Sequence, residues 1–384
     1  VAQQTPYVLH LDGGSVVTRR QFENELIDAM SVRALIEMDC AATTIGAYDL
    51  FRGLEYYKSL ISGTGLAVVS ANVYDESTGD LAVQPYVIVD RAGIRFAVTG
   101  ALNPEADIRT DREVKSLGAV IGDPKESLAA ILPELREKAD FVVLLSQLGL
   151  DKTKLLAEEL PGLDFVLIGE TPQYSAETFE VGGAVMLQPG YKGQRICDSR
   201  LEFGPEAIYE GSSGKVVDLG DKVPSDAAMA LLLKEHKIAV EEASKQRALA
   251  NKPTPSQARP QEKYVEECLG VEASCVRCHQ TQYQQWKSTA HSGAFATLEE
   301  GHQSTNPECL RCHVTCHLDL PADGSVSVRE ELRNVQCEAC HGKATEHARD
   351  GSYGNVTVAT CKTCHDQENS PDFDFATYLP KVTH

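Results

Sequence analysis

Four short segments in the last third of this 384-residue sequence share one arrangement of cysteine and histidine. Each has two cysteines separated by two residues, with a histidine directly after the second cysteine. They are CVRCH at Cys275–His279, CLRCH at Cys309–His313, CEACH at Cys337–His341 and CKTCH at Cys361–His365. Two thiols at this spacing can form thioethers to the two vinyl groups of one haem, and the histidine then lies beneath the iron as its proximal ligand. A zinc site or a disulfide would explain one such segment, but not four that all end in histidine. We therefore predict four covalently attached haem c groups.

The predicted attachment residues follow directly from the motifs. The haem-bound cysteines are Cys275, Cys278, Cys309, Cys312, Cys337, Cys340, Cys361 and Cys364, and the proximal histidines are His279, His313, His341 and His365. The second motif contains an overlapping pattern that ends in Cys316 and His317. Because Cys312 can serve only one haem and the shorter spacing matches the other motifs, we assign Cys309 and Cys312 to the haem. Cys316 is then free or disulfide-bonded, and Cys40 and Cys197 are either free thiols or a second disulfide.

The remaining histidines decide what the irons can do. After residue 250 there are five histidines outside the motifs, namely His291, His302, His317, His347 and His384. Four irons with two histidine ligands each need four of them, which leaves His317 as the spare candidate. An iron with both axial positions filled transfers electrons and binds no substrate. We predict electron transfer. The alternative is a reductase or oxidase of a small nitrogen or sulfur compound at one iron that lacks its distal ligand.

Composition and chemistry also bear on location and partners. Haem of this type is attached outside the cytoplasm, so we expect a periplasmic or extracellular protein. The sequence has no apolar run of about 18 residues, which predicts no transmembrane segment and a chain that is soluble, mature or trimmed. The formal charge of −20 argues against nucleic acid as a partner. The expected partners are redox proteins or other copies of this chain, including self-association into an electron-conducting filament.

The cysteine-rich third also resembles a known family. The segments YQQWKSTAHSGAFATL, NPECLRCHVT, VQCEACHGKATEH and ENSPDFDFATYLPKVTH are similar to the tetrahaem cytochrome c-554 type family over residues 268–384. The resemblance implies that His291 and His347 are distal ligands and that the tail ending at His384 fits the same role, and His302 is the fourth distal candidate. Cys316 stands where the family would have glycine.

The first two-thirds of the chain alternate between apolar runs and helical patterns, which predicts an α/β domain. The runs AATTI, GLAVVSA, FVVLLS and DFVLIG indicate strands, PYVIVDRAGIRFAVTG a hairpin, and DPKESLAAILPELREKA a helix that begins at Asp123 as N-cap. We predict a layered α/β domain at residues 1–222, a helix and proline-rich linker at 223–262, and a mainly helical or irregular multihaem domain at 263–384.

The α/β part resembles the 5′-nucleotidase branch of the calcineurin-like metallophosphoesterases. VLHLDGGS, TTIGAYDLFRGLEYY, VVSANVYDESTG, VVLLSQLGLD and GLDFVLIGETPQ carry the resemblance, over about residues 7–205. It implies a two-metal site that activates water. The positions of its ligands and catalytic histidine are occupied by Ser15, Ala47, Tyr48, Gln147, Glu170 and Pro172. We therefore expect a scaffold or docking domain and a protein that is no enzyme, with a metal-dependent hydrolase as the alternative.

Overall fold

The computed structural model forms two compact units, one reaching to Leu232 and the other beginning at Leu233. It describes residues 7–18, 24–108, 116–169, 174–175, 177–190, 193, 195–205, 208–220, 223–250, 268–316, 328–352, 354–366 and 369–384. The boundary falls inside helix α5 (Ala227–Ala250). The predicted linker, with His317, Glu170 and Pro172, lies outside the described residues. The three-part division at residues 222 and 262 stays a prediction.

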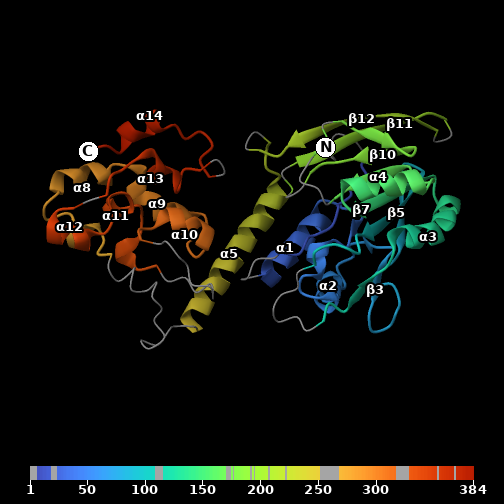
Figure 1. Ribbon diagram of the computed structural model, residues 1–384, viewed down its shortest axis with the longest axis horizontal. Coiled ribbons are helices and arrows are strands. Elements are labelled where there is room, and N and C mark those ends of the chain that lie inside the picture. Colours follow the sequence, from blue (N-terminus) through green and yellow to red (C-terminus); the bar gives the residue numbers. More distant parts are fainter. Residues whose placement is uncertain are drawn as a thin grey trace. The chain divides into compact units, whose positions relative to one another are not determined.

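The first unit is built on a six-stranded sheet with the order β4-β5-β7-β8-β10-β9 (Figure 1). The central neighbours β5, β7, β8 and β10 pair in parallel, and the edge strands β4 and β9 are antiparallel. The strands are β4 (Tyr86–Arg91), β5 (Ile94–Leu102), β7 (Phe141–Gln147), β8 (Phe165–Ile168), β9 (Phe179–Val181) and β10 (Ala184–Leu187). The predicted hairpin is β4 with β5.

Both faces of this sheet are buried. Along β7, Val142 and Leu144 belong to one apolar cluster, while Val143 and Leu145 belong to another on the opposite face. Successive side chains of a strand point to opposite faces, so an unbroken apolar run such as FVVLL suits a strand that is covered on both sides. Helices α3 (Pro124–Lys138) and α4 (Leu150–Glu159) contribute to the first cluster, and strands β11 (Arg195–Phe203) and β12 (Tyr209–Asp218) to the second. The predicted layered α/β architecture is confirmed.

Local sequence signals account for further features of the first unit. The side chain of Asp123 accepts a hydrogen bond from the backbone N–H of Glu126 and caps α3, with Pro124 at its first position, as the sequence predicts. The stretch TTIGAYDLFRGLEYY forms a two-residue strand, a 3₁₀ turn and a helix. The other elements are α1 (Asn24–Glu37), β1 (Thr43–Thr44), η1 (Ala47–Leu50), α2 (Leu54–Ile61), β2 (Val68–Val69), β3 (Val73–Asp75) and β6 (Ala119–Ile121).

The second unit consists of short helices and turns, as expected. After α5 come α7 (Val271–Ser274), α8 (Gln280–Lys287), η3 (Ala290–Gly293), α9 (Ala294–Glu300), α10 (Pro307–His313), η4 (Glu330–Leu332), α11 (Cys337–His341), α12 (Ala344–Asp350), α13 (Val358–Lys362), α14 (Phe375–Tyr378) and η5 (Leu379–Lys381). Its largest buried apolar cluster among the described residues is Phe295, Leu298, Leu310 and Val314. This cluster is small beside the two that enclose the sheet of the first unit.

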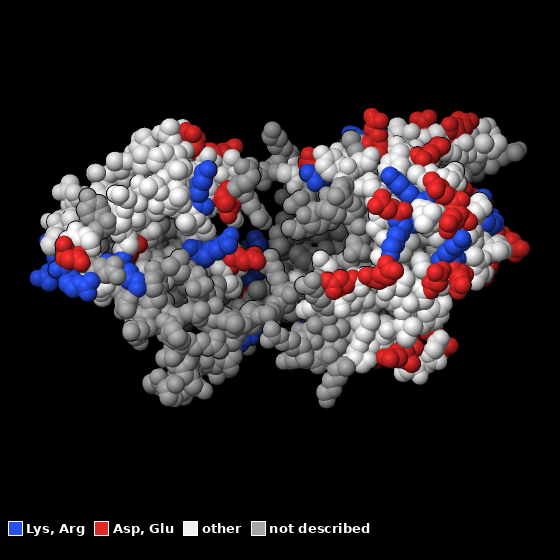
Figure 2. Space-filling model, viewed as in Figure 1, with Lys and Arg blue, Asp and Glu red and all other residues white. Residues whose placement is uncertain are grey.

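Charged side chains of both signs are interspersed over the part of the surface that Figure 2 shows, around the α/β unit in particular. Among the described residues, no helix combines the length and apolar character that crossing a bilayer requires.

Candidate functional site

The four cysteine motifs are held by short helical turns. The second and third motifs form the end of α10 and all of α11, the fourth begins in α13, and the first follows α7. In a helical turn, residues three apart lie on the same side. The two cysteines of each motif are three apart, so the local fold directs both thiols toward one ligand.

Histidines of three motifs are paired with histidines outside the motifs. The ring centres are 5.9 Å apart for His279 and His347, 6.2 Å for His291 and His365, and 5.6 Å for His341 and His384. Histidine nitrogen binds transition metals at about 2 Å, so two imidazoles on opposite sides of one iron have centres roughly 6 Å apart. The donor set and its spacing therefore fit haem iron. Each pair joins a predicted proximal histidine with a predicted distal one.

Hydrogen bonds at Nδ1 orient several of these rings. His313 Nδ1 donates to the carbonyl of Ala294 at 2.6 Å, and His347 Nδ1 donates to the carbonyl of Ser352 at 3.0 Å. His365 Nδ1 lies 3.1 Å from the hydroxyl of Ser370. A metal-binding histidine is commonly held through its second ring nitrogen in this way. Nε2 is then the nitrogen that remains for iron.

Thiols of different motifs lie next to each other and give the motifs a spatial order. Cys275 of the first motif hydrogen-bonds with Cys337 of the third. Cys340 of the third interacts electrostatically with the cysteines of the fourth, and Cys364 of the fourth hydrogen-bonds with Cys312 of the second. These interactions link the first motif with the third, the third with the fourth, and the fourth with the second.

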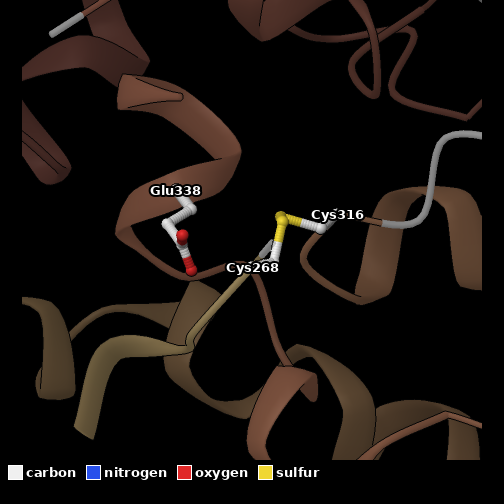
Figure 3. A group of neighbouring side chains, drawn as sticks. All are labelled: Cys268, Cys316 and Glu338. Atoms are coloured by element: carbon white, nitrogen blue, oxygen red, sulfur yellow. A yellow bond between two sulfur atoms is a disulfide. The ribbon is translucent and has the colours of Figure 1, made fainter. Parts of the chain in front are cut away.

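A disulfide joins Cys268 to Cys316 (Figure 3). Of the two alternatives for Cys316, the disulfide is the one found. Glu338 lies beside it, buried, and its carboxylate accepts hydrogen bonds from the backbone N–H groups of Gly270 at 2.9 Å and Ala344 at 2.8 Å. In the described part of the chain, Cys268, Cys316 and Glu338 are the only three residues of metal-binding types that lie close together. The two sulfurs are bonded to each other.

The two cysteines of the α/β unit, Cys40 and Cys197, are free thiols, and burial raises the pKa of Cys40 to about 12.

His302 lies in a different environment, next to helix α5. Its Nδ1 is 3.2 Å from Oε2 of Glu241, and Ser304 Oγ donates to the other oxygen. Burial raises the pKa of Glu241, but the bonds from Ser304 and His302 and the charge of Lys245 outweigh it, so the net shift is downward and the carboxylate is ionised. A cavity of about 530 Å³ adjoins this group, lined by Glu241, Lys245, Phe295, Glu299, His302, Ser304, Thr305, Val328 and Arg333. No sequence motif distinguishes Glu241 from the other glutamates of α5, so its role could not be predicted from the sequence.

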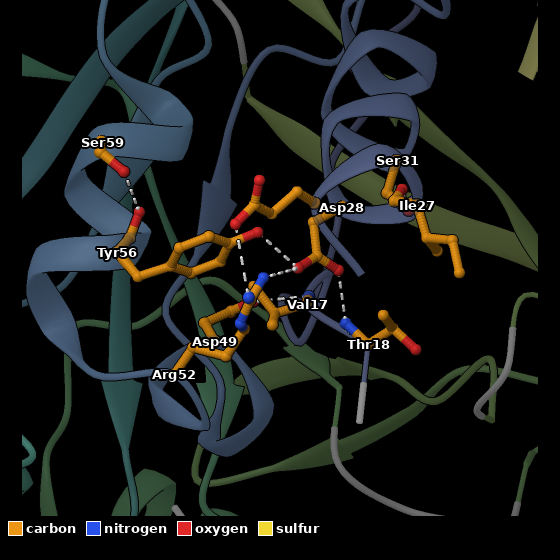
Figure 4. Close-up of polar contacts among 10 residues, drawn as sticks. Val17, Thr18, Ile27, Asp28, Ser31, Asp49, Arg52, Tyr56 and Ser59 are labelled. Carbon is orange, nitrogen blue, oxygen red and sulfur yellow. Dashed lines mark hydrogen bonds and ion pairs between the residues drawn. The ribbon is translucent and has the colours of Figure 1, made fainter. Parts of the chain in front are cut away.

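In the α/β unit, the loops before η1 are organised by a buried carboxylate. Asp49 accepts hydrogen bonds from the backbone N–H groups of Ser15, Val16, Val17 and Gly46, at 2.8–3.1 Å. Burial raises its pKa to about 7, although these bonds oppose the shift. Asp28, also fully buried, accepts from Thr18 N–H at 2.7 Å and from the Tyr56 hydroxyl at 2.8 Å (Figure 4). Both carboxylates therefore serve as acceptors within the fold.

The described residues do not fit the two-metal site that the family resemblance implies. Ala47 is buried and offers no ligand atom, whereas Tyr48 is exposed. Both oxygens of Asp49 are engaged by backbone N–H groups, and Gln147 Nε2 donates to the carbonyl of Gly13. Within the described residues of this unit, no three histidine, cysteine, aspartate or glutamate side chains converge as a metal site requires. We therefore derive no reaction step through metal ions here.

The fold of the first unit is that of the metallophosphoesterases. Its sheet and helices match the sulfate thiohydrolase SoxB of Thermus thermophilus in a complex with glycerol, with a TM-score of 0.54, 22% identity, and coverage of 61% of this chain and 43% of that one. They also match a 5′-nucleotidase precursor from the same species, with a TM-score of 0.56, 19% identity, and coverage of 63% and 51%. At these identities the likeness establishes the fold alone.

Curated relatives point to the same class. A 5′-nucleotidase of Vibrio cholerae is 26% identical over 229 residues, which is 56% of this chain and 40% of that protein. A 2′,3′-cyclic-nucleotide 2′-phosphodiesterase/3′-nucleotidase of Yersinia enterocolitica is 31% identical over 156 residues, 36% of this chain and 24% of that protein. The chain spans less than half the length of these relatives.

The second unit matches a different family. Residues 274–342 match the family model for cytochrome c554 and c-prime. The chain thus joins a region similar to cytochrome c554 and c-prime to a domain similar to the 5′-nucleotidases, and both predicted resemblances are confirmed. One prediction is contradicted: we expected no enzyme, but the named relatives of the α/β unit are nucleotidases and phosphodiesterases.

Proposed function

We propose that the second unit is an electron-transfer cytochrome that holds four haem c groups, each with two histidine ligands. The observation that carries the proposal is the set of three histidine pairs with ring centres 5.6–6.2 Å apart. When bound, haem supplies reversible one-electron chemistry. The cysteines of the motifs would anchor it, and the paired histidines would bind its iron, which favours electron transfer over substrate binding.

The arrangement of the motifs favours a continuous path. Thiol interactions that link the first motif with the third, the third with the fourth, and the fourth with the second support this path. His341 also interacts electrostatically with His279 and His347, so two of the histidine pairs are adjacent. Closely spaced redox centres in this order would let electrons enter at one end of the unit and leave at the other. Redox proteins or further copies of this chain, up to a filament, are the proposed partners.

An oxidising compartment suits this proposal. Covalent haem attachment and the Cys268–Cys316 disulfide both belong to proteins outside the cytoplasm. We therefore propose export to the periplasm or the cell exterior.

Low-temperature electron paramagnetic resonance of the oxidised, haem-loaded protein tests the ligand set. We expect four low-spin haems per chain. His384→Ala removes one distal ligand, so one haem in four should become high-spin while the haem content stays unchanged. His10→Ala, in the α/β unit, is the matched control and should leave all four haems low-spin. A high-spin haem in the unmodified protein would contradict the proposal and favour a reductase or oxidase with an open iron.

A second candidate is catalysis by the α/β unit, which its named nucleotidase and phosphodiesterase relatives favour. Phosphate release from nucleoside monophosphates and cyclic nucleotides, measured with and without added Mn²⁺ or Zn²⁺, tests it. Turnover that is lost on unfolding the α/β unit, while the haem spectrum persists, would assign a hydrolysis to this chain.

A further inference from the structure

Helix α5 contributes one buried carboxylate to the second unit, that of Glu241. Its side chain is 8% exposed. Three groups surround it: His302 Nδ1 lies 3.2 Å from Oε2, Ser304 Oγ donates to Oε1, and Lys245 Nζ lies 3.5 Å from Oε1. A charged group at this depth needs such partners. The carboxylate is therefore fixed with one oxygen aimed at the imidazole.

The Nδ1 partner of His302 differs in charge from the Nδ1 partners of His313, His347 and His365. Nδ1 of His313 and of His347 bonds to a backbone carbonyl, and Nδ1 of His365 lies against a hydroxyl. These acceptors are neutral, whereas Glu241 is a carboxylate. An N–H bond to a carboxylate is stronger, and it raises the basicity of the opposite nitrogen of the ring. Nε2 of His302 is accordingly the strongest donor in this set.

The segment of His302 lies beside the second haem motif, because the thiol of Cys309 is 3.9 Å from Oε1 of Gln303, the residue that follows His302. His302 has φ of 53°, in the left-handed region that non-glycine residues seldom adopt. Its side chain is 34% exposed and lines the cavity of about 530 Å³. Phe295 and Val328 line that cavity, and Cys309, the first cysteine of the motif, packs against the same apolar cluster.

We propose that Glu241 is a positioning residue, which orients His302 and strengthens it as a ligand for the haem iron of the second motif. The inference rests on the proposed function. It assigns a residue of α5 to the haem-binding site, although α5 lies outside the residues matched by the cytochrome family model.

Glu241→Gln in the full-length, haem-loaded protein tests the proposal. Glutamine keeps an oxygen that can accept from Nδ1 but removes the charge. We expect the midpoint potential of one haem in four to shift upward, because a weaker donor stabilises ferric iron less, and the low-spin resonance of that haem to change. Glu241→Leu removes the acceptor, and we expect binding of His302 to iron to weaken about 10- to 100-fold, seen as a high-spin fraction.

Glu299→Gln is the matched control. Glu299 lines the same cavity and carries the same charge, but its carboxylate faces Arg333 at 3.5 Å. Equal potential shifts in Glu241→Gln and Glu299→Gln would reveal a through-space charge effect and overturn the positioning role, and so would no shift in Glu241→Gln. His302→Ala separates the two proposals. A new high-spin haem in that variant, with neither Glu241 variant altered, leaves the ligand set standing and overturns only the role of Glu241. No new high-spin haem means that His302 binds no iron, which overturns the role of Glu241 but not the proposal of four low-spin haems, since the unmodified protein tests that one.

Discussion

At the scale of single residues, Asp49 stabilises the backbone around the turn between strand β1 and helix α2. Four backbone N–H groups converge on its carboxylate. The segment that looks most like an active-site loop thus uses the acidic side chain at its tip as an anchor for neighbouring backbone. An acceptor with this many backbone donors organises the loops whether or not any chemistry takes place there.

The raised pKa of Asp49 predicts a pH dependence of stability. Its ordinary value is 3.8 and burial raises it to about 7 in the fold. Between these values the folded chain keeps a proton that the unfolded chain releases, so the free energy of unfolding falls as pH rises, by about 1.4 kcal/mol per pH unit at most. Above about 7 the loss is complete. Asp49→Asn, which cannot ionise, should flatten this slope between about pH 4 and pH 7.

Urea unfolding followed by circular dichroism at several pH values measures the slope. Asp12, Asp28 and Asp164 also have pKa values raised by burial, so part of the slope should remain in the variant. Asp151→Asn, at the exposed start of α4, is the control and should leave the slope unchanged. An Asp49→Asn variant with the full slope of the parent would refute the assignment.

At the scale of elements, local sequence signals were reliable where neighbours in the chain make the structure. The N-cap Asp123, the hairpin of β4 with β5 and the buried run of β7 all follow from residues within a few positions of each other. The candidate site is different. Its histidine pairs, its disulfide and the Glu241–His302 bond join residues that are 43 to 74 positions apart. Spacing identifies the residue types needed, but only the packed fold decides which distant residues meet.

The Cys268–Cys316 disulfide is the clearest case of such a long-range connection between elements. It ties the segment before α7 to the residues after α10 across a sequence separation of 48. It also removes Cys316 from competition with Cys309 for the shared Cys312, which supports assigning the shorter spacing to the haem.

We predict that the double variant Cys268→Ser, Cys316→Ser is destabilised. A disulfide closing a loop of this length stabilises the fold by about 4 kcal/mol in the chain-entropy model. The haem Soret absorbance during thermal unfolding reports the second unit and should show a lower midpoint. Cys197→Ser, which removes a free thiol of the α/β unit, is the control. Equal midpoints in the double variant and the parent would mean that the disulfide adds nothing to stability.

At the scale of the whole molecule, two units with different kinds of interior share one chain. The α/β unit buries both faces of its sheet with side chains alone. The second unit has only small clusters of buried apolar side chains among its described residues, such as that around Leu310. Under the proposed function, four porphyrins would supply the apolar mass that its side chains lack.

Because each apolar cluster draws its residues from one unit, we predict two separable unfolding transitions. Leu145→Ala leaves a cavity in the sheet of the α/β unit, where Leu145 is fully buried, and should cost about 2–5 kcal/mol. It should lower the midpoint of the circular-dichroism transition of that unit and leave the Soret midpoint unchanged. Leu310→Ala, equally buried in the second unit, should do the reverse. Helix α5 crosses the boundary between the units. Movement of both midpoints in either variant would show that the two units unfold as a single cooperative structure.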